Sequence, residues 1–434
     1  MAVKLPEAYR NAENHLLDNQ FEEALRGFCS VAKAAPKHLW VRFKIATTLE
    51  KMKKPMRAVD VYKALAWHSI KAGFPFVGLV AIKRAVSIQA TFEEALDTLA
   101  DLYSLESERI NAELPLFDLP ELDEEALVEP VDVDNDRLAA YAEQLAKEFS
   151  DHRYPSELPA IPLFSLLTTE AFYPILEILQ LRTFDPGEVI VSQGDPCTSI
   201  YMLAHGEVEI TEGHEGDSKS LARLTSGSVF GEMALITDAP RLASATAVRE
   251  TDVLELRSDD LEMAAEDLDD ITWAMAKFTR QRFLNNLLLT SPVFEPFSDE
   301  DKKEILDRFS SIGVPTDEVI IKEGTPGPGL YIILGGEVEV SKFEGDTRVH
   351  LAKLAEGSVF GEISLINDSP TTATVQAIRG GEFLFLSKDD FRELVEEKPE
   401  IHEALSKLSQ ERLDEQRSAI DNIGKISADG TVIF

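Results

Sequence analysis

The sequence predicts a multidomain α+β chain, in which an N-terminal α-helical repeat is followed by two β-jelly-roll domains with flanking helices. Over the first hundred residues, apolar side chains recur at the three- and four-residue spacing of packed helices. Further on, GSVFGEMALITDAPRLASA from Gly227 returns as GSVFGEISLINDSPTTATV from Gly357, at an offset of 130 (357 minus 227). The same register holds from Phe164 and Phe294 onward. A self-similarity this long indicates a duplicated domain.

The helical part shows a repeat of its own. Ala24 and Ala58 are separated by 34 (58 minus 24), and Phe28 and Tyr62 follow them by four residues. This period resembles the tetratricopeptide repeat, a helix hairpin that stacks into a solenoid with a concave peptide-binding face. The resemblance implies an unidentified protein partner. A third unit is irregular, since the step from Ala58 to Ala81 is only 23 (81 minus 58), and a plain helical bundle without a groove is the alternative.

An acidic segment separates the helices from the duplicated part. Between Glu113 and Asp136 there are ten acidic residues, no basic ones and three prolines, a composition that does not bury a core. Apolar side chains within it, Leu116, Phe117 and Leu119, are candidates for docking on a neighbouring domain. The expected divisions are 1–110 for the helical repeat, 111–160 for the linker with a short helix, 161–290 and 291–418 for the two β domains, and 419–434 for the tail.

Each β domain is expected to contain about eight short antiparallel strands closed as a jelly roll. Runs such as EVIVSQG and SIYMLAHGEVEIT alternate apolar and polar residues between turns rich in Gly, Asp and Pro. A helical pattern ends each copy, from about Ser258 to Leu289 in the first and from about Lys388 to Ser418 in the second. The role of the apolar TVIF terminus is left open.

Composition excludes several classes of protein. The 43 Lys and Arg against 78 Asp and Glu give a net charge of -35, which repels nucleic-acid phosphates. The two cysteines, Cys29 and Cys197, make no metal-ligand spacing and fit a reducing compartment. No signal peptide or membrane span is apparent. We therefore predict a soluble cytoplasmic protein with no metal, no nucleic-acid partner and no membrane span.

One sequence stretch carries a specific resemblance. FGEMALITDAPRLASA, together with the upstream FDPGEVIVSQGD and IYMLAHGEVEI, resembles the phosphate-binding cassette of cyclic nucleotide-binding domains. The resemblance covers both copies, from about Pro162 to Leu413. Their tandem arrangement is similar to the regulatory subunits of cyclic-nucleotide-dependent protein kinases. It implies a cyclic nucleotide as ligand, no other cofactor and no catalysis. A kinase is one partner option, but no Arg-Arg inhibitor segment precedes the first copy, where His152-Arg153-Tyr154 is a poor substitute.

The residue types of the first cassette suit a cyclic phosphodiester. Arg241 can meet its oxygens with a bidentate, charge-assisted pair. Gly231 and Ala234 are small enough to let main-chain N–H groups approach the phosphate, and Leu242 offers a further N–H. Glu232 is an acceptor suited to the ribose 2′-hydroxyl, where the family places its glutamate.

Two further residues bear on the base. Trp273, on the helix after the first barrel, is a candidate cap that would stack on the base, although a core-facing tryptophan is the commoner outcome. Leu242 follows the arginine at a position where relatives selective for cyclic GMP often carry a hydroxyl. Cyclic AMP is therefore favoured over cyclic GMP.

The second copy departs from the first at the arginine. It keeps Gly361 and Glu362, but Thr371, followed by Thr372, replaces the cation. A phosphate would then face a carboxylate without compensation, which predicts a degenerate site with weak or absent cyclic nucleotide binding. Nearby basic residues that could replace the arginine are Lys322, Arg348 and Lys353. The sequence does not show whether their side chains reach the pocket.

The sequence thus predicts a cytoplasmic receptor that binds cyclic AMP in its first β domain and alters a protein–protein interaction. The signal is expected to pass along the helix from Ser258 to Leu289. The alternative is a scaffold whose jelly rolls bind no nucleotide and whose helical repeats recruit a partner. A helix-turn-helix with basic residues, membrane spans and a cupin metal cluster are all missing from the sequence, which argues against a transcription factor, a channel and an enzyme. Oligomeric state is left open.

Overall fold

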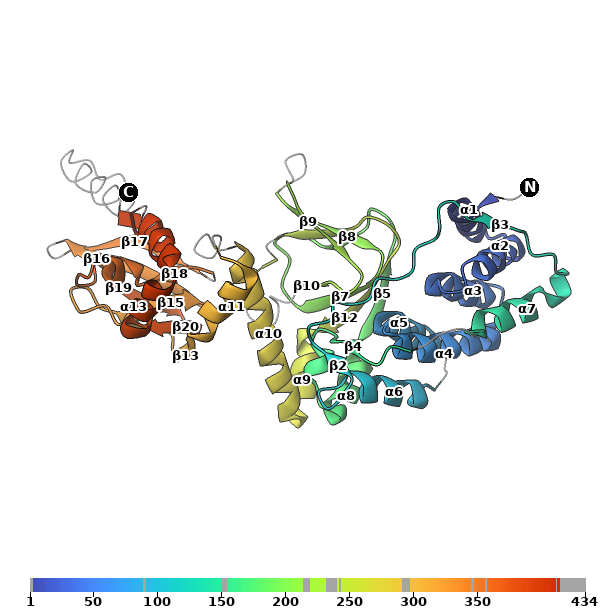
Figure 1. The fold of residues 1–434 in the computed structure, drawn as a ribbon, viewed down its shortest axis with the longest axis horizontal. Helices are drawn as coiled ribbons and strands as arrows, with labels where there is room; N and C mark the ends of the chain where they lie inside the picture. Colours follow the sequence, from blue (N-terminus) through green and yellow to red (C-terminus); the bar gives the residue numbers. More distant parts are fainter. Residues whose placement is uncertain are drawn as a thin grey trace. The chain divides into compact units, whose positions relative to one another are not determined.

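A computed structural model describes residues 3–88, 91–149, 154–213, 219–231, 240–241, 243–290, 297–344, 347–355, 357–410 and 412–413. The chain forms two compact units, Met1–Phe278 and Thr279–Phe434 (Figure 1). The first unit contains the helical region and one β domain, and the second contains the other β domain. Within the described residues, no helix is both long and apolar enough to cross a membrane.

The helical region has the periodicity that the sequence indicates. Helix α3 begins one repeat period after α1 (39 minus 5 is 34), and α4 begins one period after α2 (55 minus 21 is 34). Ala24 and Ala58 are fully buried. A Cβ on Gly27 would lie 2.7 Å from the Cβ of Ala12, so α1 and α2 approach too closely for any side chain there. The helices are α1 (Leu5–Leu17), α2 (Phe21–Ala34), α3 (Leu39–Lys51), α4 (Pro55–Ala72), α5 (Pro75–Val86) and α6 (Glu93–Tyr103).

A seventh helix, α7 (Asn135–Lys147), packs against α2, α3 and α4. Arg42 of α3 anchors its end, because the Nη1 atom donates to the main-chain oxygens of Leu145 at 2.7 Å and Ala146 at 3.0 Å. A cation at the C-terminus of a helix also interacts favourably with the negative end of the helix dipole. The face shared by α2, α3 and α4 is therefore covered by the chain itself.

Parts of the acidic segment pack on the first unit. Strand β1 (Val3–Lys4) pairs with β3 (Leu127–Val128), and β2 (Ile110–Asn111) pairs in parallel with β4 (Leu158–Pro159). Leu116 and Leu119 pack against the hydrophobic core, and the ring of Phe117 lies near Phe74. Burial of these few apolar side chains attaches the acidic segment to the first unit, although its overall composition is that of a linker.

The first β domain is a sandwich of two four-stranded antiparallel sheets, ordered β10-β7-β12-β5 and β6-β11-β8-β9. A 3-10 turn (Phe164–Leu166) and helix α8 (Thr169–Ile178) precede it. In β11 every second residue is buried, whereas in β7 every residue except the last is buried. The strands are β5 (Gln180–Phe184), β6 (Val189–Val191), β7 (Ser199–His205), β8 (Glu207–Glu212), β9 (Lys219–Thr225), β10 (Val229–Phe230), β11 (Ser244–Ala247) and β12 (Thr251–Arg257).

The helical pattern after this sandwich forms two helices where the sequence indicated one. Helix α9 (Ser258–Asp267) ends at Leu268, whose φ of -140° and ψ of 105° are extended, and α10 (Asp269–Thr290) follows. An extended residue cannot continue the helical hydrogen-bond pattern. The expectation of a single helix from Ser258 to Leu289 is therefore wrong.

The second β domain repeats the architecture, with sheets ordered β13-β20-β15-β18 and β14-β19-β16-β17. The predicted jelly rolls and the multidomain α+β class are confirmed. A helix over 399–410, continued at 412–413, follows α13. The elements are α11 (Asp299–Asp307), β13 (Ser310–Val314), β14 (Val319–Ile321), β15 (Gly329–Ile333), β16 (Glu337–Glu344), β17 (Thr347–Leu354), β18 (Val359–Phe360), α12 (Glu362–Ile366), β19 (Thr374–Arg379), β20 (Gly381–Ser387) and α13 (Lys388–Glu397).

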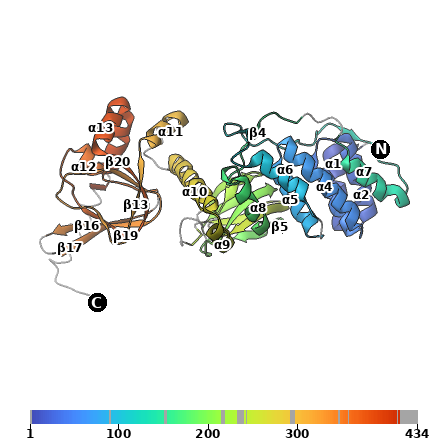
Figure 2. The ribbon, with the colours of Figure 1, turned by 90° about the horizontal axis from the view of Figure 1, so that it is seen from below.

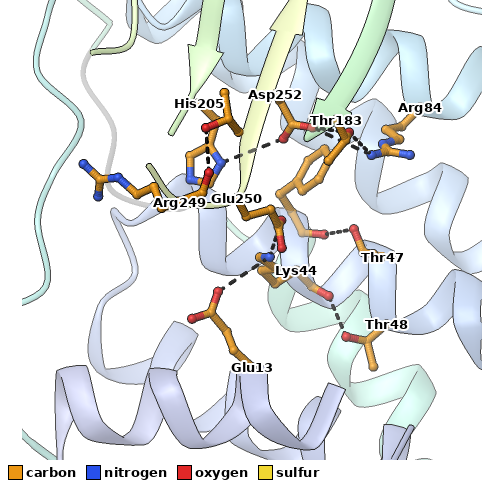
Figure 3. A network of polar contacts seen from close by, with 12 residues as sticks. Glu13, Lys44, Thr47, Thr48, Arg84, Thr183, His205, Arg249, Glu250 and Asp252 are labelled. Atoms are coloured by element: carbon orange, nitrogen blue, oxygen red, sulfur yellow. Dashed lines mark hydrogen bonds and ion pairs between the residues drawn. The ribbon is translucent and has the colours of Figure 1, made fainter. Parts of the chain in front are cut away.

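The helical region packs directly on the first sandwich. Helix α5 lies against β5 and β7, and α6 lies against α8 (Figures 1 and 2). Figure 3 shows the polar contacts at this junction. The buried Lys44 places its Nζ 2.6 Å from Glu250 Oε1 and 3.6 Å from Glu13 Oε1. The rings of Trp40 and His205 have centroids 4.1 Å apart. These contacts join α1 and α3 to the ends of β7 and β12.

His205 makes this junction sensitive to pH. Burial, with Lys44 next in importance, lowers the pKa of His205 to about 4, and the Nδ1 atom lies 3.8 Å from Asp252 Oδ2. Because the unfolded side chain titrates near 6.5, its neutral form stabilises the fold above that pH, and the contribution falls as pH decreases towards 4. The full loss is roughly 3 kcal/mol at about 1.4 kcal/mol per unit. Burial raises the pKa of Asp252, which opposes part of the loss at the acidic end.

We therefore expect the free energy of unfolding of the first unit to decrease between pH 6.5 and 4, and His205→Phe to flatten this decrease. Phenylalanine keeps a ring against Trp40 without a titratable group. The measurement is urea unfolding followed by tryptophan fluorescence, because Trp40, Trp67 and Trp273 all lie in the first unit. An unchanged pH slope in His205→Phe would contradict the assignment.

Candidate functional site

Arg241 is a buried arginine at the start of the segment that leads into β11, and it is 7% exposed. Its Nη1 donates to the main-chain oxygen of Gly231 at 3.0 Å, and its Nη2 donates to that of Ser199 at 2.6 Å. The buried Nε makes no hydrogen bond to the described residues. Arg241 forms no ion pair with an acidic residue in the described part of the chain. In the described part of the chain, the guanidinium of Arg241 therefore contacts only carbonyl oxygens and keeps one donor unsatisfied. A buried cation in this state is suited to bind an anion.

Gly231 is required for this arrangement. Its φ is +76°, a left-handed conformation, and a Cβ on it would lie 2.6 Å from Nη1 of Arg241. Any side chain at 231 would therefore strain the main chain and displace the guanidinium. The structure thus brings together two of the residues that the sequence selected.

The residues behind Arg241 belong to β7 and β12. The Oγ of Ser199 donates to Glu255 Oε1 at 2.8 Å, and the hydroxyl of Tyr201 donates to the same oxygen at 3.3 Å. Arg182 pairs with Glu255 Oε2 at 3.1 Å. The guanidinium carbon of Arg241 lies 5.7 Å from the ring centroid of Tyr201. Sequence reasoning missed Ser199 and Glu255, because a main-chain oxygen and a strand carboxylate carry no motif.

The described part of the structure does not bring every predicted residue to this site. Glu232, Ala234 and Leu242 lie outside the described residues. Trp273 lies on α10 with 49% of its surface exposed, and Nζ of Lys277 is 4.6 Å from its ring centroid. The core-facing orientation favoured for Trp273 is therefore wrong, and its role as a base cap stays a prediction.

The second sandwich brings Gly361, Glu362, Thr371 and Thr372 together around one cavity. Gly361 has a φ of +91°, and Glu362 is 1% exposed. The hydroxyl of Thr371 donates to the main-chain oxygen of Lys322 at 2.6 Å. Thr371 thus ties two loops of the barrel together where the first copy has its guanidinium.

A cation reaches Glu362 from elsewhere in the chain. Arg412, on the helix that follows α13, places Nη1 2.8 Å from Glu362 Oε1, and the same atom donates to the main-chain oxygen of Val359. The sequence did not indicate this partner for Glu362, and weak or absent cyclic nucleotide binding in the second domain stays a prediction. Arg412 and Glu362 are distant in sequence (412 minus 362 is 50), and Arg412 lies outside any motif. The candidates Lys322, Arg348 and Lys353 do not line the cavity.

The cavity of the second sandwich is partly open to solvent. Its polar lining consists of Glu362, Ser364, Arg412 and the two threonines. The apolar lining consists of Ile321, Val340, Leu351, Ala352, Leu354, Phe360, Ile363, Ala373 and Val375. Among the described residues, no group of three or more His, Cys, Asp or Glu is placed to hold a metal ion.

A comparison with models of protein families identifies the family of the two sandwiches. The model described as cyclic nucleotide-binding domain matches residues 181–267 and 312–398, which are the two β domains. The chain contains two cyclic nucleotide-binding domains. Arg241 and Gly231 belong to the first, and the cavity with Glu362 belongs to the second, with Arg412 contributed from beyond the matched residues.

Curated relatives cover the same part of the chain. A cAMP-dependent protein kinase regulatory subunit of Yarrowia lipolytica is 33% identical over 233 residues, which are 54% of this chain and 58% of the relative. The protein of the same name in Debaryomyces hansenii is 30% identical over 234 residues, 54% of this chain and 49% of the relative. The chain thus spans about half the length of these relatives.

A solved structure of the same kind is also similar. The regulatory domain of Toxoplasma gondii PKA, crystallised with cAMP, is 24% identical and is aligned over 57% of this chain and 92% of its own, with a TM-score of 0.28.

Proposed function

We propose that the chain is a cytoplasmic cyclic nucleotide receptor whose first cyclic nucleotide-binding domain takes the ligand through Arg241. Output is a changed protein–protein interaction, and the chain performs no chemistry of its own. The observation that carries the proposal is the buried guanidinium of Arg241, held by the main-chain oxygens of Gly231 and Ser199 with Nε unsatisfied. A cyclic phosphodiester bears one negative charge and would replace these carbonyl contacts with charge-assisted hydrogen bonds.

Cyclic AMP is the proposed nucleotide. The relatives from Yarrowia lipolytica and Debaryomyces hansenii carry cAMP in their names. Leu242 offers no hydroxyl for a guanine at the position after the arginine. One such contact contributes about 1–3 kcal/mol, enough to bias the choice between the two nucleotides.

Strand β7 offers a route from the site to the helical region. The main-chain oxygen of its first residue, Ser199, accepts from Arg241, and the ring of its last residue, His205, lies tilted against that of Trp40 in α3. A phosphate that withdraws Arg241 from Ser199 would change the environment at one end of the strand. A difference of a few kcal/mol between two placements of α3 would suffice for regulation. A route through α9 and α10 does not exclude this one.

The helical region is the proposed surface for a protein partner. The kinase-subunit names of the relatives suggest a kinase catalytic chain as one partner. Because α7 covers the face of α2, α3 and α4, a partner would either use another face or displace α7. The scaffold alternative, in which the β domains bind no nucleotide, predicts recruitment that is indifferent to cyclic AMP.

Calorimetric titration of the wild-type chain with cyclic AMP and with cyclic GMP tests the proposal. We expect one cyclic AMP per chain, with an affinity for cyclic AMP at least about tenfold above that for cyclic GMP, a difference of about 1.4 kcal/mol. Heat from neither nucleotide would contradict the receptor proposal and favour the scaffold. Two equal sites would contradict the assignment of a degenerate second domain.

A further inference from the structure

We propose that Leu116 and Phe117 of the acidic segment belong to a strap that holds the turn leading into the first cassette, and that docking of this strap and binding of cyclic nucleotide oppose one another. The strap comprises residues 113–122, which lie between β2 and β3 in the first unit (Figure 1). Both side chains act through the main chain of the cassette, so they are positioning residues. The direction of the effect rests on the proposed function of Arg241, whereas the holding of the turn does not.

The strap contacts the first β domain at a glycine. Gly227, in the turn between β9 and β10, has a φ of +92°, and a Cβ on it would overlap Cδ1 of Leu116. The Cγ and Cβ atoms of Leu116 lie 3.6 and 3.8 Å from the same position. A side chain at 227 would therefore be strained and would displace Leu116. Because Leu116 also packs against the hydrophobic core of the first unit, it fixes this turn to that core.

The next residue of the strap contacts a second glycine, in the helical region. Gly73 ends α4 with a φ of +92°, and a Cβ on it would overlap the ring of Phe117. The same ring lies edge-on to that of Phe74, with centroids 6.3 Å apart. Aromatic pairs at this separation attract one another beyond the burial of their surface. Two adjacent side chains of the strap thus join the turn after α4 to the turn before β10.

The held turn leads directly to the proposed nucleotide site. The N–H of Gly227 donates to the main-chain oxygen of Leu203 at 2.7 Å, and the N–H of Leu203 donates to that of Ser228 at 2.8 Å, so the turn is bonded to β7. The two residues of β10 follow, and then Gly231, whose main-chain oxygen accepts from Nη1 of Arg241 at 3.0 Å. A shift of the turn therefore reaches this hydrogen bond through a short stretch of main chain.

Competition for Arg241 sets the direction of the coupling. A phosphate that binds Arg241 takes the donors that the main-chain oxygens of Gly231 and Ser199 accept. The docked strap favours the placement of Gly231 in which its hydrogen bond to Arg241 exists, so the strap opposes the phosphate. Because coupling between two binding events is reciprocal, cyclic AMP should loosen the strap by the factor by which loss of the strap raises cyclic AMP affinity.

Substitutions in the strap of the full chain test the effect on affinity. Leu116→Ala and Phe117→Ala should each raise the affinity for cyclic AMP at least about fivefold in calorimetric titration. The double variant should lie within about twofold of the tighter single variant, because a strap released at one end no longer holds the turn. Leu119→Ala, which removes another partly buried leucine of the strap, should stay within about twofold of wild type. Unchanged or lower affinity in either of the first two variants, or an equal rise in Leu119→Ala, would overturn the proposal.

A substitution outside the strap displaces it from the helical side. Gly73→Ala places a methyl group against Phe117, whereas Gly187→Ala introduces the same left-handed strain, at a φ of +85°, where the described structure leaves the new Cβ open space. We expect Gly73→Ala to raise cyclic AMP affinity as Phe117→Ala does, and Gly187→Ala to leave it unchanged. An equal response of the two glycine variants would reject the role of the strap. Calorimetric melting shows whether each variant is folded, and if Gly73→Ala is not, the substitutions in the strap decide.

Hydrogen exchange separates the strap from the proposed function. Without nucleotide, Leu116→Ala should speed exchange in residues 225–231 at least about threefold over wild type, and Leu119→Ala should not, because exchange reports local opening. Equal protection in Leu116→Ala and wild type would overturn the holding of the turn. Cyclic AMP should speed exchange in residues 113–122 of the wild type, and slower or unchanged exchange there in the bound protein would refute the coupling. If the wild type binds no cyclic AMP, the proposed function fails, and the comparison without nucleotide decides the role of the strap.

Discussion

Arg241→Ala should reduce the affinity of the first domain for cyclic AMP by at least about 100-fold. Removing one member of a buried, hydrogen-bonded charge pair typically costs about 2–5 kcal/mol, and 100-fold corresponds to about 2.7 kcal/mol. Arg241→Lys keeps the charge and loses the planar fork, so its affinity should lie between those of Arg241→Ala and the wild type. Calorimetric titration of the three proteins at one salt concentration measures the series.

The control for this series is Arg223→Ala. Arg223 is an exposed arginine of β9 that pairs with Glu207 at 3.1 Å, and surface pairs of this kind contribute about 0–1 kcal/mol. Its removal should change cyclic AMP affinity less than threefold. Arg241→Ala also loses the hydrogen bonds to the main-chain oxygens of Gly231 and Ser199, so calorimetric melting without ligand must first show that the variant is folded. Affinity within threefold of wild type in a folded Arg241→Ala protein would remove Arg241 from the site.

The duplicated cassette was predictable because its residues are local in sequence. Gly361, Glu362 and Thr371 lie within eleven positions of one another, and a shared motif places such residues on one side of a barrel. Arg412 was not predictable, because it reaches Glu362 from a helix beyond the barrel, and helical periodicity does not specify which neighbour a side chain meets. The cation that meets Glu362 is therefore supplied by the tertiary fold and not by the motif.

The same distinction applies to the first unit. The repeat period of the helices could be read from Ala24 and Ala58, because close helix packing requires small side chains at a fixed period. The packing of α7 on these helices could not be predicted from the sequence, because its amphipathic pattern fits several partners equally well. Nor could Lys44 be assigned to Glu250, from which it is far removed in sequence (250 minus 44 is 206). Long-range polar partners depend on tertiary packing that a single sequence does not display.

Arg42→Ala should lower the free energy of unfolding of the first unit by about 3 kcal/mol. Arg42 is 2% exposed, and besides its contacts with α7 its Nη2 donates to the main-chain oxygen of Pro36 at 2.8 Å. Hydrogen bonds from a charged group contribute about 1.5–3 kcal/mol each, and relief from burying the guanidinium offsets part of their loss. Burial lowers the pKa of Arg42 to about 10, so the side chain is charged at neutral pH. The alanine would also leave a cavity beside Phe149, whose ring centroid lies 4.4 Å from the guanidinium carbon.

Two companion variants separate packing from hydrogen bonding. Arg42→Met keeps much of the side-chain volume and should recover only the part of the loss that arises from packing. Arg57→Ala removes another contact to α7, an ion pair with Glu143, but Arg57 is 44% exposed and its loss should cost less than about 1 kcal/mol. Urea unfolding followed by tryptophan fluorescence reports on the first unit alone, since all three tryptophans lie there. If Arg42→Ala and Arg57→Ala lower stability equally, Arg42 does not anchor α7, and the covering of the helical face would rest on apolar contacts.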